Sequence, residues 1–213
     1  MGLDLVVEGS AKLGHETEWR QLLERSFADD RLSVSEIARF NVISVPGHAR
    51  IGAPRVGTDA AADAWIMEAR KEQTPEEVAA TLEEFPGYNV LRLVKCDGLP
   101  FYSNGGLYDG VDETSFRGAF LKGCTNVIDK RLLNAAWEHK LPDEAVAYGR
   151  ALLAAADAAE TAPRAAHESF LTRLGLVKSA KPVPLTEQLD IVRAAGRWFV
   201  FWGERGHPIR AYF

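Results

Sequence analysis

Cysteine is nearly absent: only Cys96 and Cys124 occur among 213 residues, and no CxxC pair is present. A disulfide-stabilised small fold needs more cysteines, and a cysteine zinc site needs closer spacing. We therefore expect two half-buried thiols in a reducing cytoplasm. Alanine is abundant and arginine outnumbers lysine, a composition typical of bacterial proteins from GC-rich genomes.

The chain also lacks a large excess of charge of one sign and any long hydrophobic run. Its formal net charge is -5 at pH 7 and its pI is about 5.6, which excludes a general nucleic-acid binder, because such proteins cluster Lys and Arg against phosphates. The longest apolar run, residues 151–156, is far shorter than the roughly 18 residues of a membrane span. Met1 to Asp4 contain no basic segment followed by an apolar one, so we predict no secretory signal and a cytoplasmic protein without a membrane partner.

Recognisable catalytic and metal motifs are missing as well. Residues 9–14 have the glycine spacing of a phosphate-binding loop, but His15-Glu16 follows where Lys-Ser/Thr would bind the phosphates. His15-Glu16 also begins like a zinc-protease helix, yet Trp19 stands where the second His ligand belongs. No GxSxG or GxGxxG is found, and the five histidines show no pair at ligand spacing. We therefore predict no metal and no cofactor.

Hydrophobic periodicity predicts an α+β fold in which a small mixed or antiparallel sheet is covered by several helices. A helix start with a capping box is predicted by Thr74-Pro75-Glu76-Glu77, with Pro75 at the first helical position. The expected helices cover 16–27, 60–71, 75–85, 130–139, 142–159 and 164–174, and one more is expected after Asp112, with Phe116, Ala119 and Phe120 on one face. The expected strands cover 3–7, 41–45, 89–95 and 208–213.

The C-terminal part differs in composition from the rest. We predict a main α+β domain over 1–160, with 161–213 forming a helix and a β-meander packed on it. Trp198 to Trp202 are strong strand formers, which favours a hairpin over 188–203. Residues 185–193 also fit a helix, so both alternatives stay open. Core packing is expected for this aromatic cluster and for Trp137.

One candidate site is the loop 46–57, rich in Pro and Gly, which we expect to join a strand to a helix N-terminus. Free backbone N–H groups there, with Arg50 and Arg55, are suited to a carboxylate or phosphate. His48 is a candidate general acid or base. The alternative is a plain connection whose arginines are solvated or paired with surface acids.

The second candidate is the long glycine-containing loop 97–113, because long ordered loops often bind ligands. Its polar and aromatic side chains suit a small polar ligand or a partner surface. The residues concerned are Tyr102, Ser103, Asn104 and Tyr108 as ligand-binding groups and Asp109 as an acid or base. The alternative is a set of turns, since Asn104-Gly105 and Asp109-Gly110 are common turn pairs.

Three functions fit these features, and whether the protein is an enzyme stays open. The favoured one is a non-catalytic module that binds a protein partner. The second is an enzyme or sensor for a small anionic ligand held between loops 46–57 and 97–113. The third is a homodimer that associates through the C-terminal strands. The second function requires both loops to border one pocket.

Overall fold

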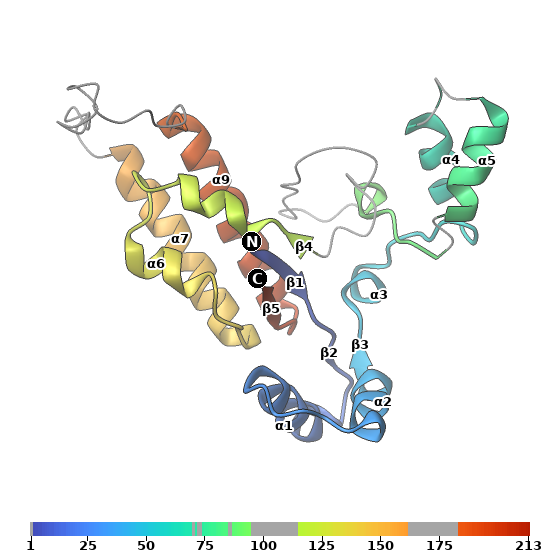
Figure 1. Ribbon diagram of the computed structural model, residues 1–213, viewed down its shortest axis with the longest axis horizontal. Coiled ribbons are helices and arrows are strands. Elements are labelled where there is room, and N and C mark those ends of the chain that lie inside the picture. The colour runs from blue at the N-terminus through green and yellow to red at the C-terminus, as the bar shows by residue number, and fades with distance from the viewer. Residues whose placement is uncertain (1, 70, 72–73, 85–86, 95–114, 162–182) are drawn as a thin grey trace.

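The computed structural model describes residues 2–69, 71, 74–84, 87–94, 115–161 and 183–213 (Figure 1). The strands are β1 (Asp4–Val7), β2 (Ser10–Ala11), β3 (Ser44–Val45), β4 (Ser115–Phe116) and β5 (Ile209–Tyr212). The helices are α1 (Glu16–Phe27), α2 (Val34–Ile43), α3 (Gly47–Ile51), α4 (Ala60–Ala69), α5 (Pro75–Glu84), α6 (Lys130–Ala135), α7 (Pro142–Thr161) and α9 (Leu185–Glu204), with 3-10 turns η1 (Leu91–Leu93) and η2 (Gly118–Gly123). The predicted α+β class is confirmed.

The main sheet joins the two ends of the chain. Its order is β4-β1-β5, with both pairings antiparallel. Leu5 stands opposite Phe116 on one side and Ala211 on the other, and all three side chains are buried. Paired residues share a face of the sheet, so this register places one apolar face toward the core. The Phe116 ring continues that face onto α9, 5.7 Å from the ring of Trp198.

Helices α7 and α9 lie against each other and form the centre of the largest core (Figure 1). Glycines allow this contact: a Cβ on Gly149 would lie 2.6 Å from the carbonyl oxygen of Gly196, and one on Gly203 would lie 2.6 Å from that of Pro142. Arg193 of α9 adds ion pairs to Asp157 and Glu160 of α7, at 3.2 and 2.5 Å. The two helices therefore pack at close range along their length.

The hairpin predicted over 188–203 is wrong, because the whole segment belongs to α9. Trp198, Phe199, Phe201 and Trp202 are all at most 4% exposed. A helix that is buried on nearly every side can be apolar on every side, so its sequence loses the helical period and resembles a strand. Tertiary packing has overridden the strand preference of the aromatic residues. A homodimer built on those aromatic side chains would have to remove them from the core.

Two other predicted strands are also wrong. Residues 41–43 end helix α2, which starts at a capping box formed by Ser33 and Glu36, and only Ser44–Val45 pair as β3 with β2. In the 89–95 segment Asn89 forms a single bridge to Arg55, and Leu91–Leu93 form a 3-10 turn. Of the apolar residues there, Val90 belongs to a small core, whereas Leu93 is 39% exposed.

Two smaller cores lie apart from the main one. Trp19, Leu22, Leu23 and Ile43 are buried between α1 and α2. Val56, Ala62, Ile66 and Val90 are buried around α4. In Figure 1 the α1–α2 pair and the α4–α5 pair lie at different ends of the molecule, with the strands β2 and β3 between the main sheet and α3. The N-terminal part of the chain therefore builds two small units, α1–α2 and α4–α5, outside the α7–α9 core.

Several predicted elements are confirmed. Helix α1 has the expected bounds, and α4, α5, α6 and α7 and the strands β1 and β5 lie within the predicted ranges or extend them slightly. The Thr74–Glu77 capping box is present, with N–H to oxygen distances of 2.8 and 3.3 Å. The helix predicted after Asp112 is wrong at Ser115–Phe116, which form β4, and the following Gly118–Gly123 form the 3-10 turn η2. The predicted helix at 164–174 lies outside the described residues. Within the described ranges, no helix combines the length and apolar character needed to cross a membrane.

Candidate functional site

The arginines of the loop 46–57 are engaged by different parts of the fold. The Arg50 guanidinium is exposed and donates to the hydroxyl of Ser10 at 2.9 Å. The Arg55 backbone N–H donates to Asp59 at 2.7 Å, and its Nε donates to the carbonyl of Gly87 at 3.3 Å. His48 is half-buried in the short helix α3. Among the described residues, Arg50 and Arg55 thus have different hydrogen-bond partners, and their predicted role in binding an anion stays a prediction.

The loop 97–113 lies outside the described residues. This holds for the predicted ligand-binding residues Tyr102, Ser103, Asn104 and Tyr108 and for the candidate acid or base Asp109. Whether that loop borders the 46–57 loop is therefore not tested.

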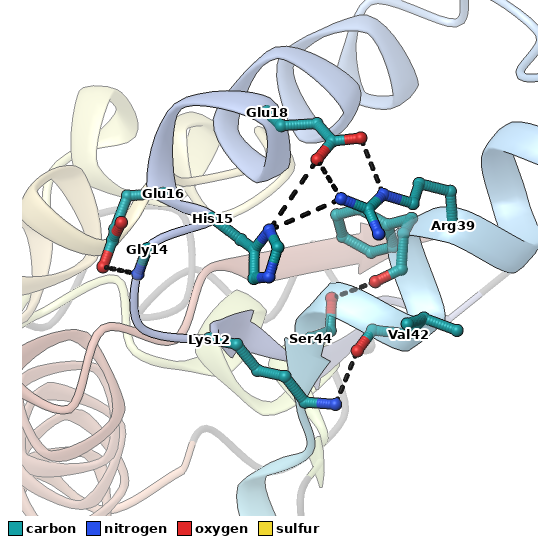
Figure 2. A network of polar contacts seen from close by, with 9 residues as sticks. Lys12, Gly14, His15, Glu16, Glu18, Arg39, Val42 and Ser44 are labelled. Carbon is teal, nitrogen blue, oxygen red and sulfur yellow. Dashed lines mark hydrogen bonds and ion pairs between the residues drawn. The ribbon is translucent and has the colours of Figure 1, made fainter.

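A polar network between α1 and α2 is the next group of titratable side chains (Figure 2). Arg39 of α2 binds both carboxylate oxygens of Glu18 on α1, at 2.8 and 2.6 Å, and His15 lies 3.4 Å from the same guanidinium. Lys12 donates to the carbonyl of Val42 at 2.5 Å. The hydrogen bonds from Arg39 lower the pKa of the Glu18 carboxyl, so it stays ionised near neutral pH. This network joins α1 to α2.

Three buried titratable groups in or beside the main core have shifted pKa values. Burial raises the pKa of the Cys124 thiol to about 12, and it also raises the pKa of the Tyr148 phenol, which donates to the carbonyl of Leu132. Burial lowers the pKa of Lys140 to about 8, although its ammonium donates to the carbonyls of Ala135 and Glu138 and lies 4.5 Å from the ring centre of Tyr148. Each group is satisfied by backbone or ring partners, which is the pattern of structural residues.

A groove with an aromatic wall lies where the end of α1 meets the link from α6 to α7 and the C-terminus. It is an open depression of about 480 Å³. Its lining residues are Glu24, Phe27, Ala28, Trp137, Glu138, His139, Leu141, Glu144 and Phe213. A hollow of this size fits one or two side chains of a partner, or a small ligand.

Contacts with neighbouring side chains fix the Phe27 ring in the wall of the groove. The ring of Phe27 lies 4.7 Å from that of His139, and the guanidinium of Arg210 covers Phe27 at 4.9 Å. Arg210 itself is fixed by Glu8 at 2.5 Å and by the hydroxyl of Ser26 at 2.8 Å. Phe213, in contrast, is 68% exposed at the mouth of the groove. The wall thus combines fixed rings with one exposed ring.

The polar groups of the groove are mostly acidic. Glu144 accepts the backbone N–H of Leu141 at 2.8 Å, and Glu24 pairs with Arg20 at 2.8 Å. Glu138 has no ion pair within 4 Å among the described residues, but its charge acts on the nearby Lys140 ammonium. Nδ1 of His139 accepts the backbone N–H of Ala211 at 3.1 Å, and burial together with Arg210 lowers the pKa of this imidazole. His139 is therefore neutral at neutral pH and does not balance the carboxylates.

A second hollow, of about 580 Å³, shares Trp137 with the first. Lys122, Leu133 and Asn134 line the rest of it. The Lys122 ammonium lies 5.1 Å from the ring centre of Trp137, a cation–π contact. Trp137 is half-buried, so the core prediction for it is only partly right: its ring packs on the core and also lines both hollows.

Sequence reasoning missed this groove because its residues come from three distant segments. The spacing of Leu133 and Trp137 predicts one buried helix face, and Phe213 is the last residue of a predicted strand. Nothing in the sequence indicates that the end of α1, at Phe27, lies beside residue 139. The pairing of β1 with β5, which brings the C-terminus to this place, is a long-range contact.

No described part of the chain gathers three His, Cys, Asp or Glu side chains that could hold a metal ion. The chain has no significant match among protein-family models, among curated proteins or among solved structures.

Proposed function

We propose that this protein is a non-catalytic binding module that holds a segment of a partner protein in the Trp137 groove. The observation that carries the proposal is the position of Trp137, half-buried and shared by two hollows, with the exposed Phe213 at the mouth of one of them. Tryptophan set in a depression is a frequent anchor of protein interfaces, because its large ring is desolvated at low cost in conformational entropy.

The titratable groups support binding over catalysis. Among the groups with shifted pKa values, Cys124, Lys140 and Tyr148 are buried and donate to backbone carbonyls. His207 is buried as well, with Nδ1 on the carbonyl of Glu8. In the groove, a carboxylate oxygen of Glu144 and a ring nitrogen of His139 each accept a hydrogen bond from a backbone N–H group. An active site places perturbed acids and bases where a substrate can reach them.

Composition supports a bacterial cytoplasmic setting for this module, from the acidic balance, the few cysteines and the excess of arginine over lysine. The alternative function, an enzyme or sensor for a small anionic ligand held between loops 46–57 and 97–113, stays a prediction. Its support is the exposed guanidinium of Arg50, which donates to Ser10 and has further N–H groups to offer. Thermal stabilisation by phosphate that Arg50→Ala abolishes would favour it over the binding module.

The proposed function predicts that short random peptides displayed on phage and selected on the protein will bind through Trp137. Trp137→Ala should weaken the selected peptides by about thirtyfold or more, the usual loss at an interface hot spot. Phe213→Ala, at an exposed position, should weaken them less and leave folding intact. Leu13→Ala is the matched control, because Leu13 is 95% exposed and does not line the groove.

Two results would count against the binding module. One is that no peptide family is enriched over repeated selections. The other is that enriched peptides bind Trp137→Ala and Phe213→Ala as tightly as the original protein, while circular dichroism shows both variants folded.

A further inference from the structure

The two hollows that meet at Trp137 carry opposite charges. The first is bordered by Glu24, Glu138 and Glu144, and its only histidine is neutral at neutral pH. The second is bordered by Lys122, whose ammonium already occupies the neighbourhood of the Trp137 ring. A ligand that spans both hollows therefore meets negative charge at one end and positive charge at the other.

The carboxylates differ in how far they are already neutralised. Glu24 has the partner Arg20, and both side chains are about half exposed, so this pair contributes little and is easily rearranged. Glu144 keeps one oxygen on a backbone N–H, which leaves its charge in place. Glu138 has no ion pair within 4 Å among the described residues. The Lys140 ammonium interacts with both Glu138 and Glu144, so three carboxylates border the first hollow against two cations, Arg20 and Lys140. A net negative charge remains, and a cation placed there would gain from it.

We infer that the groove recognises a peptide segment that presents a lysine or arginine to the hollow bordered by Glu138 and Glu144 and an apolar side chain to the hollow bordered by Lys122 and Leu133. This inference rests on the proposed function and adds the chemistry of the partner. A second basic residue is disfavoured at the Lys122 end, because like charges would face each other there. A small amine alone would fill only one of two hollows of about 480 and 580 Å³.

The test uses three pools of labelled synthetic hexapeptides and fluorescence anisotropy. One pool carries Arg and Phe at variable spacing; in the others Gln or Glu replaces Arg. The Arg pool should bind about tenfold more tightly than the Gln pool, and the Glu pool more weakly than both. The preference should shrink as salt is added, because the carboxylates are at the surface. The double variant Glu138→Gln with Glu144→Gln should lose the preference, and Lys122→Ala should keep it.

The outcomes separate this inference from the proposed function. If binding depends on Trp137 but the Gln or Glu pool binds as well as the Arg pool, the charge inference is wrong and the binding module stands. The same conclusion follows if the double glutamine variant keeps the preference. If no pool shows binding that Trp137→Ala or Phe213→Ala weakens, both the inference and the proposed function are overturned.

Discussion

Gly149→Ala is expected to destabilise the protein by about 2–3 kcal/mol, the usual cost of overpacking a core. In an exposed helix the same change would stabilise by about 1 kcal/mol, because Gly is a poor helix former. Here the new Cβ would lie 2.6 Å from the carbonyl oxygen of Gly196 and 2.9 Å from Cβ of Phe199. The carbonyl is backbone and cannot rotate away, so α7 and α9 would have to separate.

Urea unfolding followed by circular dichroism measures this loss. Gly196→Ala should cost a similar amount, because its Cβ would lie 2.9 Å from the carbonyl oxygen of Gly149. The double variant should cost less than the sum, since a helix pair moved apart by the first methyl group has room for the second. Gly2→Ala is the control, with nothing within 4 Å of its Cβ. A rise in the unfolding midpoint of Gly149→Ala would contradict this account of the helix pair.

Stability is expected to fall by about 2 kcal/mol between pH 7 and pH 5 because of one histidine, His207. Its side chain is fully buried, Nδ1 donates to the carbonyl of Glu8 at 2.8 Å, and Nε2 has no hydrogen-bond partner among the described residues. Burial lowers the pKa of His207 to about 4, and the charges of Arg50 and Arg205 act in the same direction. Protonation inside the fold is therefore unfavourable.

The direction of this pH effect follows from the protonation of His207 in the unfolded and the folded state. The unfolded chain takes up a proton below about pH 6.5, whereas folded His207 takes it up only near pH 4. The stabilisation is complete above pH 6.5 and is lost as the pH falls toward 4. His207→Asn keeps a donor for Glu8 but does not titrate, so its unfolding midpoint should depend less steeply on pH. His15→Asn controls for the loss of a histidine as such. An unchanged slope in His207→Asn would contradict the assignment.

The local signals in the sequence were sufficient for most helices. The capping box at Thr74 and the proline at position 142 mark helix starts that the structure confirms. They failed where burial is complete: the run from Trp198 to Trp202 is apolar on every side, and only its contact with α7 decides that it is helical. They also fail at Asn41, where the apolar run that predicts a strand lies in a helix that begins at the Ser33 capping box.

The candidate site was less predictable than the fold. Arg50 and Arg55 were chosen for their residue type in a glycine-rich loop, yet each is bonded to a different element. The Trp137 groove is formed by α1, the α6–α7 link and the C-terminus, and their meeting depends on the pairing of β1 with β5 across almost the whole chain. Long-range contacts of this kind leave no pattern in a local window of sequence.

The indole N–H signals of the five tryptophans offer the most direct test of the Trp137 groove. In nitrogen-15 spectra of the labelled protein, Trp137→Phe identifies the signal of Trp137. On titration with the Arg and Phe peptide pool, that signal should move, while those of the buried Trp198 and Trp202 should stay in place. A pool that binds without moving the Trp137 signal, or that moves only the signals of other tryptophans, would show that the binding surface lies elsewhere.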